Sequence, residues 1–335
     1  MVKYFSGEEL KRKVRLSLRS AYAEGTLANI RRQVSRFQNF CREIGDPSMP
    51  ADLQTLLMYV QDLTEEFASV DTIVNYLQGV KIWHQIEGHR VDNFEHFLMK
   101  LLLRGCRRQA QYKPKQALPI TPKLLLQMYD YMQVDTAQGA TIWCLFLFAF
   151  FLVSRKSNLV PDGVKKFDHK KQLTRGNIKV RSDALLVTLD WTKTIQYNQR
   201  KLVVPLVAIP DSKLCPVKAY KTMCTMMPAG ENEPAFQFLG KRGETQPVTY
   251  QQFQRAIKRT IESVGRDPAK FSTHSFRRGG ATFAYESGVP ADTVKLMGDW
   301  QSDCYRAYLQ VSMACKTDAA LKIARRISSI ENSAF

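Results

Sequence analysis

The sequence predicts a mainly helical, α+β protein of two domains, and three observations support this prediction. Helical spacing of apolar residues runs through the first 110 residues. Between residues 177 and 206, apolar residues alternate with polar ones, which predicts a small three-stranded antiparallel sheet. The length of 335 residues suits two domains of about 100–200 residues each. We therefore expect a helical domain at 1–110, a linker at 111–120 and a mixed domain at 121–335.

Four amphipathic helices are expected in the first domain. The first begins near Leu27 and stops at Gly45-Asp46-Pro47, a sequence that ends helices. The other three are expected at residues 53–67, 70–83 and 94–102, where apolar residues recur every three or four positions. Short connections between such helices are typical of a small four-helix bundle.

A basic linker and two helices are expected next. Residues 104–115 carry five basic and no acidic side chains, and Pro114 interrupts them. Such a stretch is either a strap that lies on a phosphate backbone or an ordinary solvated linker. The second domain is expected to open with a helix from Thr121 or Pro122. A buried helix should follow from Ala140 to Val153.

The remainder of the second domain is expected to contain strands and then helices. Strands are expected near residues 177–180, 185–191 and 202–206. The last two flank a long polar loop that contains Lys193. From Cys215 onward the spacing of apolar residues is helical again.

The charge of the chain favours a polyanionic partner. The formal net charge is +18 and the isoelectric point is about 9.6. Nucleic acid is the first expectation and an anionic membrane the second. The longest apolar run, from Trp143 to Val153, is too short to span a bilayer, so we do not expect a membrane protein.

Cysteine and histidine usage favours an intracellular protein without a metal site. The seven cysteines form no C-x-x-C pair, and the five histidines do not cluster with them. We expect reduced thiols and no secretory signal. Lys11 to Arg15 is either a nuclear-import patch or the basic face of a helix. The expected location is the nucleus in a eukaryote and the cytoplasm otherwise.

One short motif carries the strongest chemical signal. Residues 272–280 read Ser-Thr-His-Ser-Phe-Arg-Arg-Gly-Gly. His274 and Arg277 are three residues apart and therefore share one face of a helix. Ser272 or Thr273 would cap that helix, whose first N–H groups would then face a bound anion. On its own, such a pair is also common on ordinary surface helices.

Further residues accompany this motif in a fixed order. They are Arg155 after the buried helix, Lys193 in the polar loop, Trp300 in Gly298-Asp299-Trp300, and Tyr308. The ordered set resembles the tyrosine recombinase (phage integrase) family, which includes the Cre and Xer recombinases. The segment from Thr273 to Leu309 is most similar to the Crypton-type branch of eukaryotic mobile elements.

The resemblance implies how these residues act on a scissile phosphate in DNA. Arg155 and Arg277 would bind the phosphate, because a planar guanidinium can hold two phosphate oxygens at once. Lys193 would give a proton to the leaving 5′-oxygen, and His274 would assist proton transfer. The resemblance implies neither metal nor ATP nor any other cofactor.

The resemblance also concerns two tyrosines, a tryptophan and an asparagine. Trp300 would pack on the phosphate and donate its indole N–H. Tyr308 would be the nucleophile, and Tyr305 would contribute core packing or a backbone contact. Many family members carry an acidic residue three positions after the first arginine, where this chain has Asn158. Asparagine can form a hydrogen bond there but not an ion pair.

The family architecture implies a C-shaped clamp around double-stranded DNA, made by a core-binding domain and a catalytic domain. The expected contacts with the DNA backbone are Arg31, Arg32, Arg36, Arg107, Arg108, Lys113 and Arg278. Arg31, Arg32 and Arg36 are expected on a common solvent-facing side of their helix. Arg278 is either a backbone contact or a solvated side chain.

The family also implies a homo-oligomer, a tetramer on DNA with a dimer at each site. The apolar side of a terminal helix at residues 319–330 would dock into a neighbouring protomer or fold back on its own domain. The first function expected is site-specific recombination. The alternatives are a catalytically silent DNA-binding protein of recombinase descent and a type IB topoisomerase-like relaxing enzyme. The complete set of six residues argues against mere binding.

Overall fold

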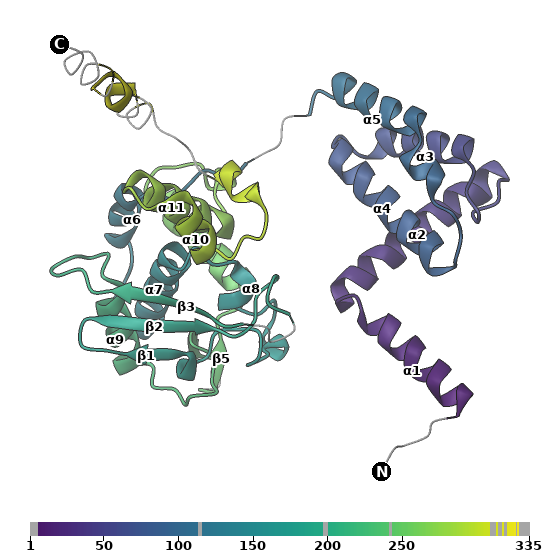
Figure 1. Cartoon of the computed structure of the whole chain (residues 1–335). Helices are drawn as coiled ribbons and strands as arrows, with labels where there is room; N and C mark the ends of the chain where they lie inside the picture. The colour runs from purple at the N-terminus through teal and green to yellow at the C-terminus, as the bar shows by residue number, and fades with distance from the viewer. Residues whose placement is uncertain are drawn as a thin grey trace. The chain divides into compact units, whose positions relative to one another are not determined.

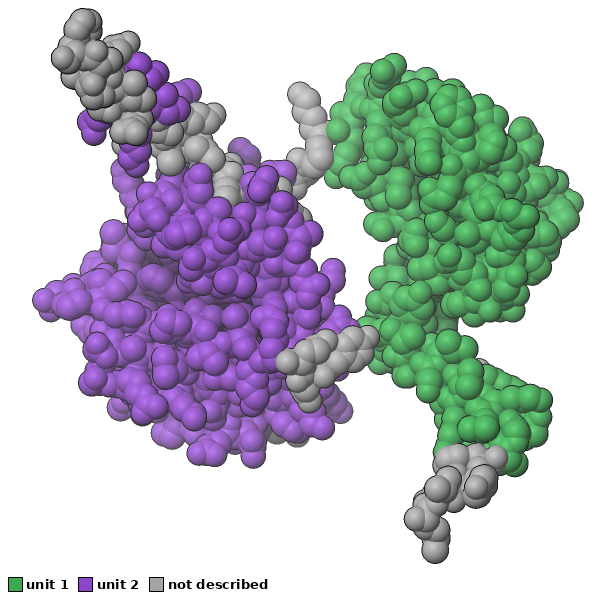
Figure 2. Space-filling view, viewed as in Figure 1, with its two compact units in different colours: residues 1–115 green, residues 116–335 purple. Residues whose placement is uncertain are grey.

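The computed structural model divides the chain into two compact units, Met1–Lys115 and Gln116–Phe335 (Figures 1 and 2). It describes residues 6–112, 116–196, 200–240 and 243–308, and in the C-terminal tail residues 313, 317, 320–325 and 327. At Arg19, Cys304, Ala307 and Tyr308 the description covers the backbone only. No helix in these ranges is both long and apolar enough to cross a membrane.

Unit 1 is helical throughout its described part. Its helices are α1 (Gly7–Ser20), α2 (Glu24–Ile44), α3 (Leu53–Glu66), α4 (Val70–Ile86), the 3₁₀-helix η1 (Asp92–Glu95) and α5 (Phe97–Gln109). The helices expected from residue 27 onward appear as α2 to α5, and α1 is an additional helix. Gly45 ends α2 with φ of 77°. Asp52 caps α3 by accepting a hydrogen bond from the Thr55 N–H at 2.6 Å.

The core of unit 1 lies between α2, α3, α4 and α5. Phe37 of α2 and Tyr59 of α3 are fully buried, with ring centroids 4.9 Å apart. His84 of α4 is also fully buried. Its Nε2 accepts a hydrogen bond from the Ala51 N–H at 3.0 Å, and its Nδ1 donates to the Val80 carbonyl at 2.9 Å. Burial lowers the pKa of His84, so the imidazole is held neutral.

Unit 2 combines helices with two small antiparallel sheets. Its helices are α6 (Pro122–Tyr129), α7 (Ala137–Phe151), α8 (Lys156–Leu159), α9 (Pro216–Met226), α10 (Tyr250–Ser263), α11 (Thr273–Glu286) and α12 (Ala291–Met297), with the 3₁₀-helices η2 (Val164–Lys166), η3 (Arg175–Asn177), η4 (Pro268–Lys270) and η5 (Asp303–Tyr308). Its strands are β1 (Ile178–Val180), β2 (Ala184–Leu189), β3 (Leu202–Val207), β4 (Gln237–Leu239) and β5 (Thr245–Pro247).

The expected three-stranded sheet is confirmed. Its order is β1-β2-β3, and Val187 in the middle strand pairs with Ile178 on one side and Val204 on the other. The β4–β5 hairpin is a correction, because the sequence from Cys215 onward predicts helices only. Each of these strands has three residues, which is too short to show an alternating pattern.

Helix α7 is the centre of unit 2. Every residue from Ala140 to Phe150 is buried, as expected for a helix that is apolar on all sides. Helix α11 lies directly against it, with α10 and α11 above α7 and the three-stranded sheet below in the view of Figure 1. The approach requires glycine, since a Cβ atom on Gly280 would lie 2.1 Å from the Phe150 carbonyl oxygen.

The end of the expected linker is part of unit 2. The Leu118 N–H donates to the Lys270 carbonyl at 2.8 Å, and the Ile120 N–H donates to the Ser275 carbonyl at 3.0 Å. A Cβ atom on Gly279 would lie 1.8 Å from the Ile120 carbonyl oxygen. The glycine pair of the motif therefore lets α11 contact both α7 and this extended segment.

Candidate active site

The site is built around the first turn of α11, which begins as the sequence predicts. Ser272 is the N-cap and accepts a hydrogen bond from the His274 N–H at 3.2 Å. The Ser275 hydroxyl accepts from the Ser272 N–H at 3.0 Å and completes a capping box. This cap places His274 and Arg277 on the first turns of a stable helix.

Arg277 is one of the largest fully buried side chains, at 2% exposure. Its guanidinium donates hydrogen bonds to the Val153 carbonyl and, at 2.7 Å, to the Gly298 carbonyl. The guanidinium carbon also lies 3.8 Å from the ring centroid of Trp300, a cation–π contact. Arg277 thus ties together three segments that are far apart in the sequence, and these contacts fix its orientation.

Arg155 lies where α7 gives way to α8. Val153 adopts a left-handed φ of 49°, which is rare for a β-branched residue, and its carbonyl accepts from Arg277. Arg155 is the N-cap residue of α8 and is half-buried. Its guanidinium makes no hydrogen bond or ion pair with the residues that the structure describes. It is therefore a cation without an internal counter-charge in this part of the chain.

His274 lies within electrostatic range of both arginines. The imidazole remains accessible to solvent, yet surrounding protein atoms displace part of its water. This desolvation, followed by nearby positive charge, lowers the pKa of His274. The charges come from Arg277, Arg155 and Lys156. A neutral imidazole beside two guanidinium groups can accept a proton while the guanidinium groups attract an anion.

Lys193 lies in a tight turn near the start of the loop that joins β2 to β3. Thr192 and Ile195 form both backbone hydrogen bonds of an isolated bridge, each 3.2 Å long. The Thr192 hydroxyl accepts from the N–H groups of Thr194 at 3.1 Å and Ile195 at 3.0 Å. The Lys193 side chain is exposed. Within the described ranges, its amine has no hydrogen-bond or ion-pair partner.

The segment after α12 connects this turn with Arg277. The Asp299 carboxylate accepts hydrogen bonds from the hydroxyls of Thr192 and Thr194. The next residue, Trp300, stacks on Arg277 and is 6% exposed. Lys193, Arg277 and Trp300 are thereby joined through one short stretch of backbone.

Asn158 has a specific partner in the structure. Its side chain is 2% exposed, and its Nδ2 donates to the Trp191 carbonyl at 2.7 Å. An ionised carboxylate at this position could not donate that hydrogen bond. The amide therefore holds the end of the strand that leads into the Lys193 turn.

The two candidate tyrosines lie on η5. Tyr305 is 2% exposed, and its ring lies 6.0 Å from that of Trp300. It belongs to a small buried cluster with Val153 and Val294. Tyr308 is the last residue of η5, and its side chain lies outside the described residues.

The expected DNA contacts differ in their surroundings. Arg31, Arg32, Arg107 and Arg108 are exposed. Arg107 pairs with exposed Asp71 at 3.3 Å. Lys113 lies outside the described residues.

Two further expected contacts have internal partners and are at least partly buried. Arg36 is less exposed than Arg31 and Arg32, and it pairs with Asp62 at 2.6 Å and Glu66 at 3.3 Å on α3. Arg278 is buried and donates to the Ala117 carbonyl at 3.1 Å. It helps to hold the extended segment at residues 117–120 on unit 2.

Asp299 is the residue that sequence reasoning missed. The sequence shows it only as the middle residue of Gly298-Asp299-Trp300. The signal that could have found it is an acidic residue directly after a glycine that ends a helix. No such signal points to its partners, which lie more than a hundred residues earlier.

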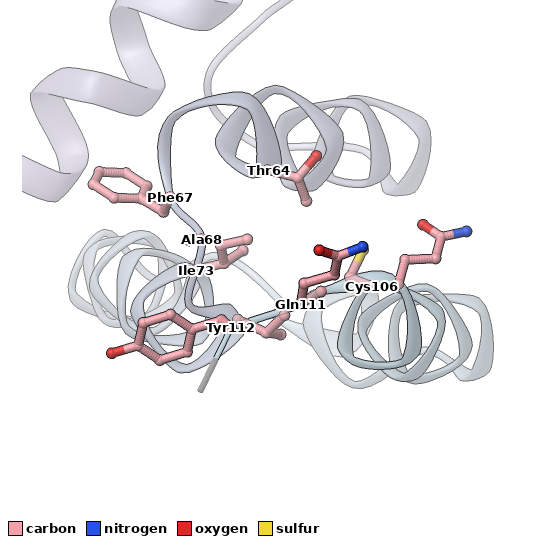
Figure 3. Close-up of a pocket in the computed structure, with 10 residues that line it drawn as sticks. Thr64, Phe67, Ala68, Ile73, Cys106, Gln111 and Tyr112 are labelled. Carbon is pink, nitrogen blue, oxygen red and sulfur yellow. The ribbon is translucent and has the colours of Figure 1, made fainter. Parts of the chain in front are cut away.

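One cavity lies in unit 1. It has a volume of about 590 Å³ and lies between the end of α3 and the end of α5 (Figure 3). Phe67, Ile73 and Tyr112 contribute to its lining. It contains none of the six expected catalytic residues. Among the described residues, no three His, Cys, Asp or Glu side chains are grouped so that they could hold a metal ion.

Comparison with known sequences adds a family and a distant relative. The model of the phage integrase family matches residues 121–314, more than half of the chain. The integrase/recombinase XerD homolog of Selenomonas ruminantium is 21% identical over 303 residues. The alignment covers 86% of this chain and 82% of the relative.

Solved structures share the fold at low sequence identity. The Tn1549 transposon integrase, in complex with circular intermediate DNA, is 16% identical with a TM-score of 0.59, over 92% of this chain and 97% of that one. A lambda integrase dimer bound to a COC′ core site is 15% identical with a TM-score of 0.57, over 90% and 76%. The XerH recombinase bound to its difH substrate is 16% identical with a TM-score of 0.57, over 95% and 85%. From the match over residues 121–314, the chain belongs to the phage integrase family of tyrosine recombinases.

Proposed function

We propose that this chain is a site-specific DNA recombinase that cleaves and rejoins duplex DNA through a 3′-phosphotyrosyl intermediate, without metal or ATP. The observation that carries the proposal is that Arg277 bonds the Val153 carbonyl, two residues before Arg155, and lies one turn after His274 on α11. Besides desolvation, both arginines lower the pKa of His274. Two guanidinium groups beside a neutral imidazole suit a phosphate that is attacked by a weakly acidic hydroxyl.

The proposed cleavage is a phosphoryl transfer from oxygen to oxygen. The Tyr308 oxygen attacks the scissile phosphorus, and the bond from phosphorus to the 5′-oxygen breaks. The phenolic proton passes to His274, and Lys193 gives a proton to the leaving 5′-oxygen. In the second step a 5′-hydroxyl of the partner strand attacks and gives its proton to Lys193, while the bond from phosphorus to Tyr308 breaks and His274 returns a proton to the Tyr308 oxygen. The number of phosphoester bonds is unchanged, so no external energy source is needed.

In this proposal Arg155 and Arg277 both stabilise the negative charge that develops on the phosphate, in different ways. A tyrosine hydroxyl has a pKa of about 10, so its attack at neutral pH depends on cations that stabilise the developing negative charge. Arg277 has a preset orientation, because backbone carbonyls and Trp300 hold its guanidinium. Arg155 supplies a cation that has no carboxylate partner in the described part of the chain. Trp300 then acts by holding Arg277 and by closing one side of the phosphate site.

The wider DNA contacts are part of the same proposal. Unit 1 would hold one side of the duplex and unit 2 the other, as in a C-shaped clamp. Exposed basic residues would contact the DNA backbone: Arg31, Arg32, Arg107, Arg108 and Lys113. Arg36 and Arg278 would contribute less, because each is at least partly buried and has an internal partner, whereas the ion pair of Arg107 with Asp71 is exposed. The terminal helix would link protomers into a tetramer, and the Crypton-type likeness would make the chain a mobile-element enzyme.

Covalent trapping tests the proposal directly. The protein is incubated with a library of duplex DNA in the absence of metal and then denatured, and the protein-linked DNA is sequenced. Wild type and Tyr305→Phe should link to DNA, whereas Tyr308→Phe should not. The library should contain a site recovered by chromatin mapping. If the protein then binds DNA tightly but forms no covalent link to it, the result would favour a silent DNA-binding protein. Relaxation of supercoiled DNA by a monomer would favour a topoisomerase-like enzyme.

A further inference from the structure

The end of α12 has an unusual residue in its cap. The Asp299 N–H donates to the Leu296 carbonyl at 3.0 Å, and the Trp300 N–H donates to the Lys295 carbonyl at 3.1 Å. These two bonds define a Schellman motif, in which the residue in the left-handed conformation is usually glycine. Here that residue is Asp299, with φ of 52°. An aspartate is less favourable than glycine in this backbone conformation, and its carboxylate makes contacts that glycine could not make.

These contacts are with the partners of the carboxylate. Asp299 is 4% exposed. One carboxylate oxygen accepts from the hydroxyls of Thr192 and Thr194, and the other accepts from the Arg200 guanidinium. Burial opposes ionisation, but the hydrogen bonds from these three groups and the charge of Arg200 lower the pKa of Asp299. The carboxylate is therefore charged and fully occupied by the hairpin loop.

The three donors surround Lys193 in the sequence. Thr192 and Thr194 are its immediate neighbours, and Arg200 is at the far end of the same loop. Gln301 adds a further contact, as its Nε2 donates to the Thr194 carbonyl at 3.4 Å. The backbone on both sides of Lys193 is thus held by the segment that follows α12, while the Lys193 side chain stays exposed.

The same segment also holds Arg277. The Gly298 carbonyl accepts from its guanidinium at 2.7 Å, and Trp300 stacks on it. Position 298 requires glycine, because the Cβ atom of any other residue would lie 1.8 Å from the Trp300 ring. Residues 298–300 therefore set the position of the Lys193 turn relative to Arg277.

We propose that Asp299 is a positioning residue, whose carboxylate holds the Thr192–Ile195 turn so that the Lys193 amine reaches the leaving oxygen. The role of Lys193 in this inference rests on the proposed function, whereas the hold of the Asp299 carboxylate on the turn, called the tether below, does not. Two measurements separate these parts. The first uses the free protein, and the second uses DNA.

Hydrogen exchange of the free protein tests the tether. Asp299→Gly removes the carboxylate and relieves the left-handed backbone, so the helix cap should survive. Asp211→Gly is the matched control, because Asp211 is an exposed aspartate with φ of 56°. We expect the amides of Thr194 and Ile195 to exchange about tenfold faster or more in Asp299→Gly, with α7 unchanged. Unchanged exchange at both amides would overturn the inference.

Cleavage of two substrates tests the consequence. One is ordinary DNA, and the other carries sulfur in place of the leaving 5′-oxygen, because a thiolate leaves without needing a proton. On ordinary DNA we expect Asp299→Gly and Lys193→Ala to lose about 100-fold or more in cleavage rate. On the sulfur substrate both should come within about tenfold of wild type, because misplacement of a proton donor then has little effect.

The outcomes are distinguishable. An equal loss on both substrates would mean that Asp299 only supports the fold, and it would overturn the positioning role. Cleavage of ordinary DNA at the wild-type rate, despite faster exchange, would also overturn it. If wild type and Asp211→Gly link to no DNA at all, the proposed function fails. The exchange result then still decides whether Asp299 holds the turn.

Discussion

Arg36 in unit 1 and Arg155 in unit 2 show two ways of placing a half-buried cation. Arg36 lies between Asp62 and Glu66, so its charge is neutralised within the unit. Arg155 has no carboxylate partner among the described residues and lies close enough to His274 to affect its titration. A charge that has left water without a partner is costly, so the protein gains from an anion that binds there.

The two histidines repeat this contrast. His84 is fully buried, and both ring nitrogens are satisfied by backbone groups of unit 1. His274 remains accessible, and positive charge contributes to the lowering of its pKa. The imidazole of His84 is thus satisfied within unit 1, whereas His274 at the first turn of α11 stays available to a ligand.

The largest effect is expected from Arg277→Lys. Lysine keeps the charge but cannot bond the carbonyls of Val153 and Gly298 in the same geometry. We expect covalent DNA linkage to fall about 1,000-fold and the free energy of unfolding to fall about 2 kcal/mol, by urea titration. Arg36→Lys, as the control in unit 1, should link DNA within about threefold of wild type. Equal losses in both variants would remove the contrast between the two regions.

Gly280→Ala should destabilise unit 2 more than any glycine substitution in an open helix. Its Cβ would meet the backbone carbonyl of Phe150, which cannot move without shifting α7. We expect a loss of about 3 kcal/mol in unfolding free energy. Gly105→Ala in α5, where no atom lies within 4 Å, should instead gain about 0.5 kcal/mol. A Gly280→Ala protein as stable as wild type would contradict the close packing of α11 on α7.

Asn158→Asp compares one kind of hydrogen bond in the two units. The carboxylate would face the Trp191 carbonyl, which Asn158 now bonds at 2.7 Å, so we expect a loss of about 2 kcal/mol. Asn93→Asp in unit 1 is the matched variant, since Asn93 bonds the Ala51 carbonyl at 3.1 Å but is only half-buried. It should lose about 1 kcal/mol or less. A larger loss of unfolding free energy for Asn93→Asp than for Asn158→Asp, measured by urea titration, would show that burial does not set the contribution of these hydrogen bonds.

Acid should destabilise unit 1 through His84. Its pKa in the folded protein is below the ordinary value of 6.5, so the unfolded chain binds the proton more readily. Stability should therefore fall as the pH drops below about 6.5, by at most about 1.4 kcal/mol per pH unit. Hydrogen exchange of the α4 peptide measures this slope. His84→Gln should flatten it, whereas the exposed His169→Gln should leave it unchanged.

The smallest effects are expected from single arginines on α2. Arg31→Ala and Arg32→Ala should each weaken DNA binding a few-fold and reduce the salt slope by about one. Arg36→Ala should leave the slope nearly unchanged, because Asp62 and Glu66 already neutralise this charge. Affinity measured across a series of salt concentrations checks all three. A full unit of slope lost in Arg36→Ala would mean that the ion pair opens on DNA.

Much of the fold follows from local sequence patterns. The buried helix α7, a cap of α11 at Ser272 or Thr273 and the three-stranded sheet were predictable, because each depends on spacing or on neighbours within a few residues. The bounds of α7, Ala137–Phe151, differ from the expected Ala140 to Val153. The order of Arg155, Lys193, His274 and Arg277 also pointed to one site. The β4–β5 hairpin was not predictable, because strands of three residues show no periodicity.

The role of Asp299 shows where local patterns stop. The sequence places it after a glycine that ends a helix, and nothing nearby indicates that Thr192 and Thr194 would donate to its carboxylate. Arg36 shows the same limit, since its neighbours in α2 are basic and its carboxylate partners lie on α3. By itself, the sequence determined helices α2 to α7, the three-stranded sheet and the inventory of reactive residues, because these depend on short-range spacing. Only the tertiary structure decided which charges are neutralised and which turn is held, because those contacts join residues distant in the chain.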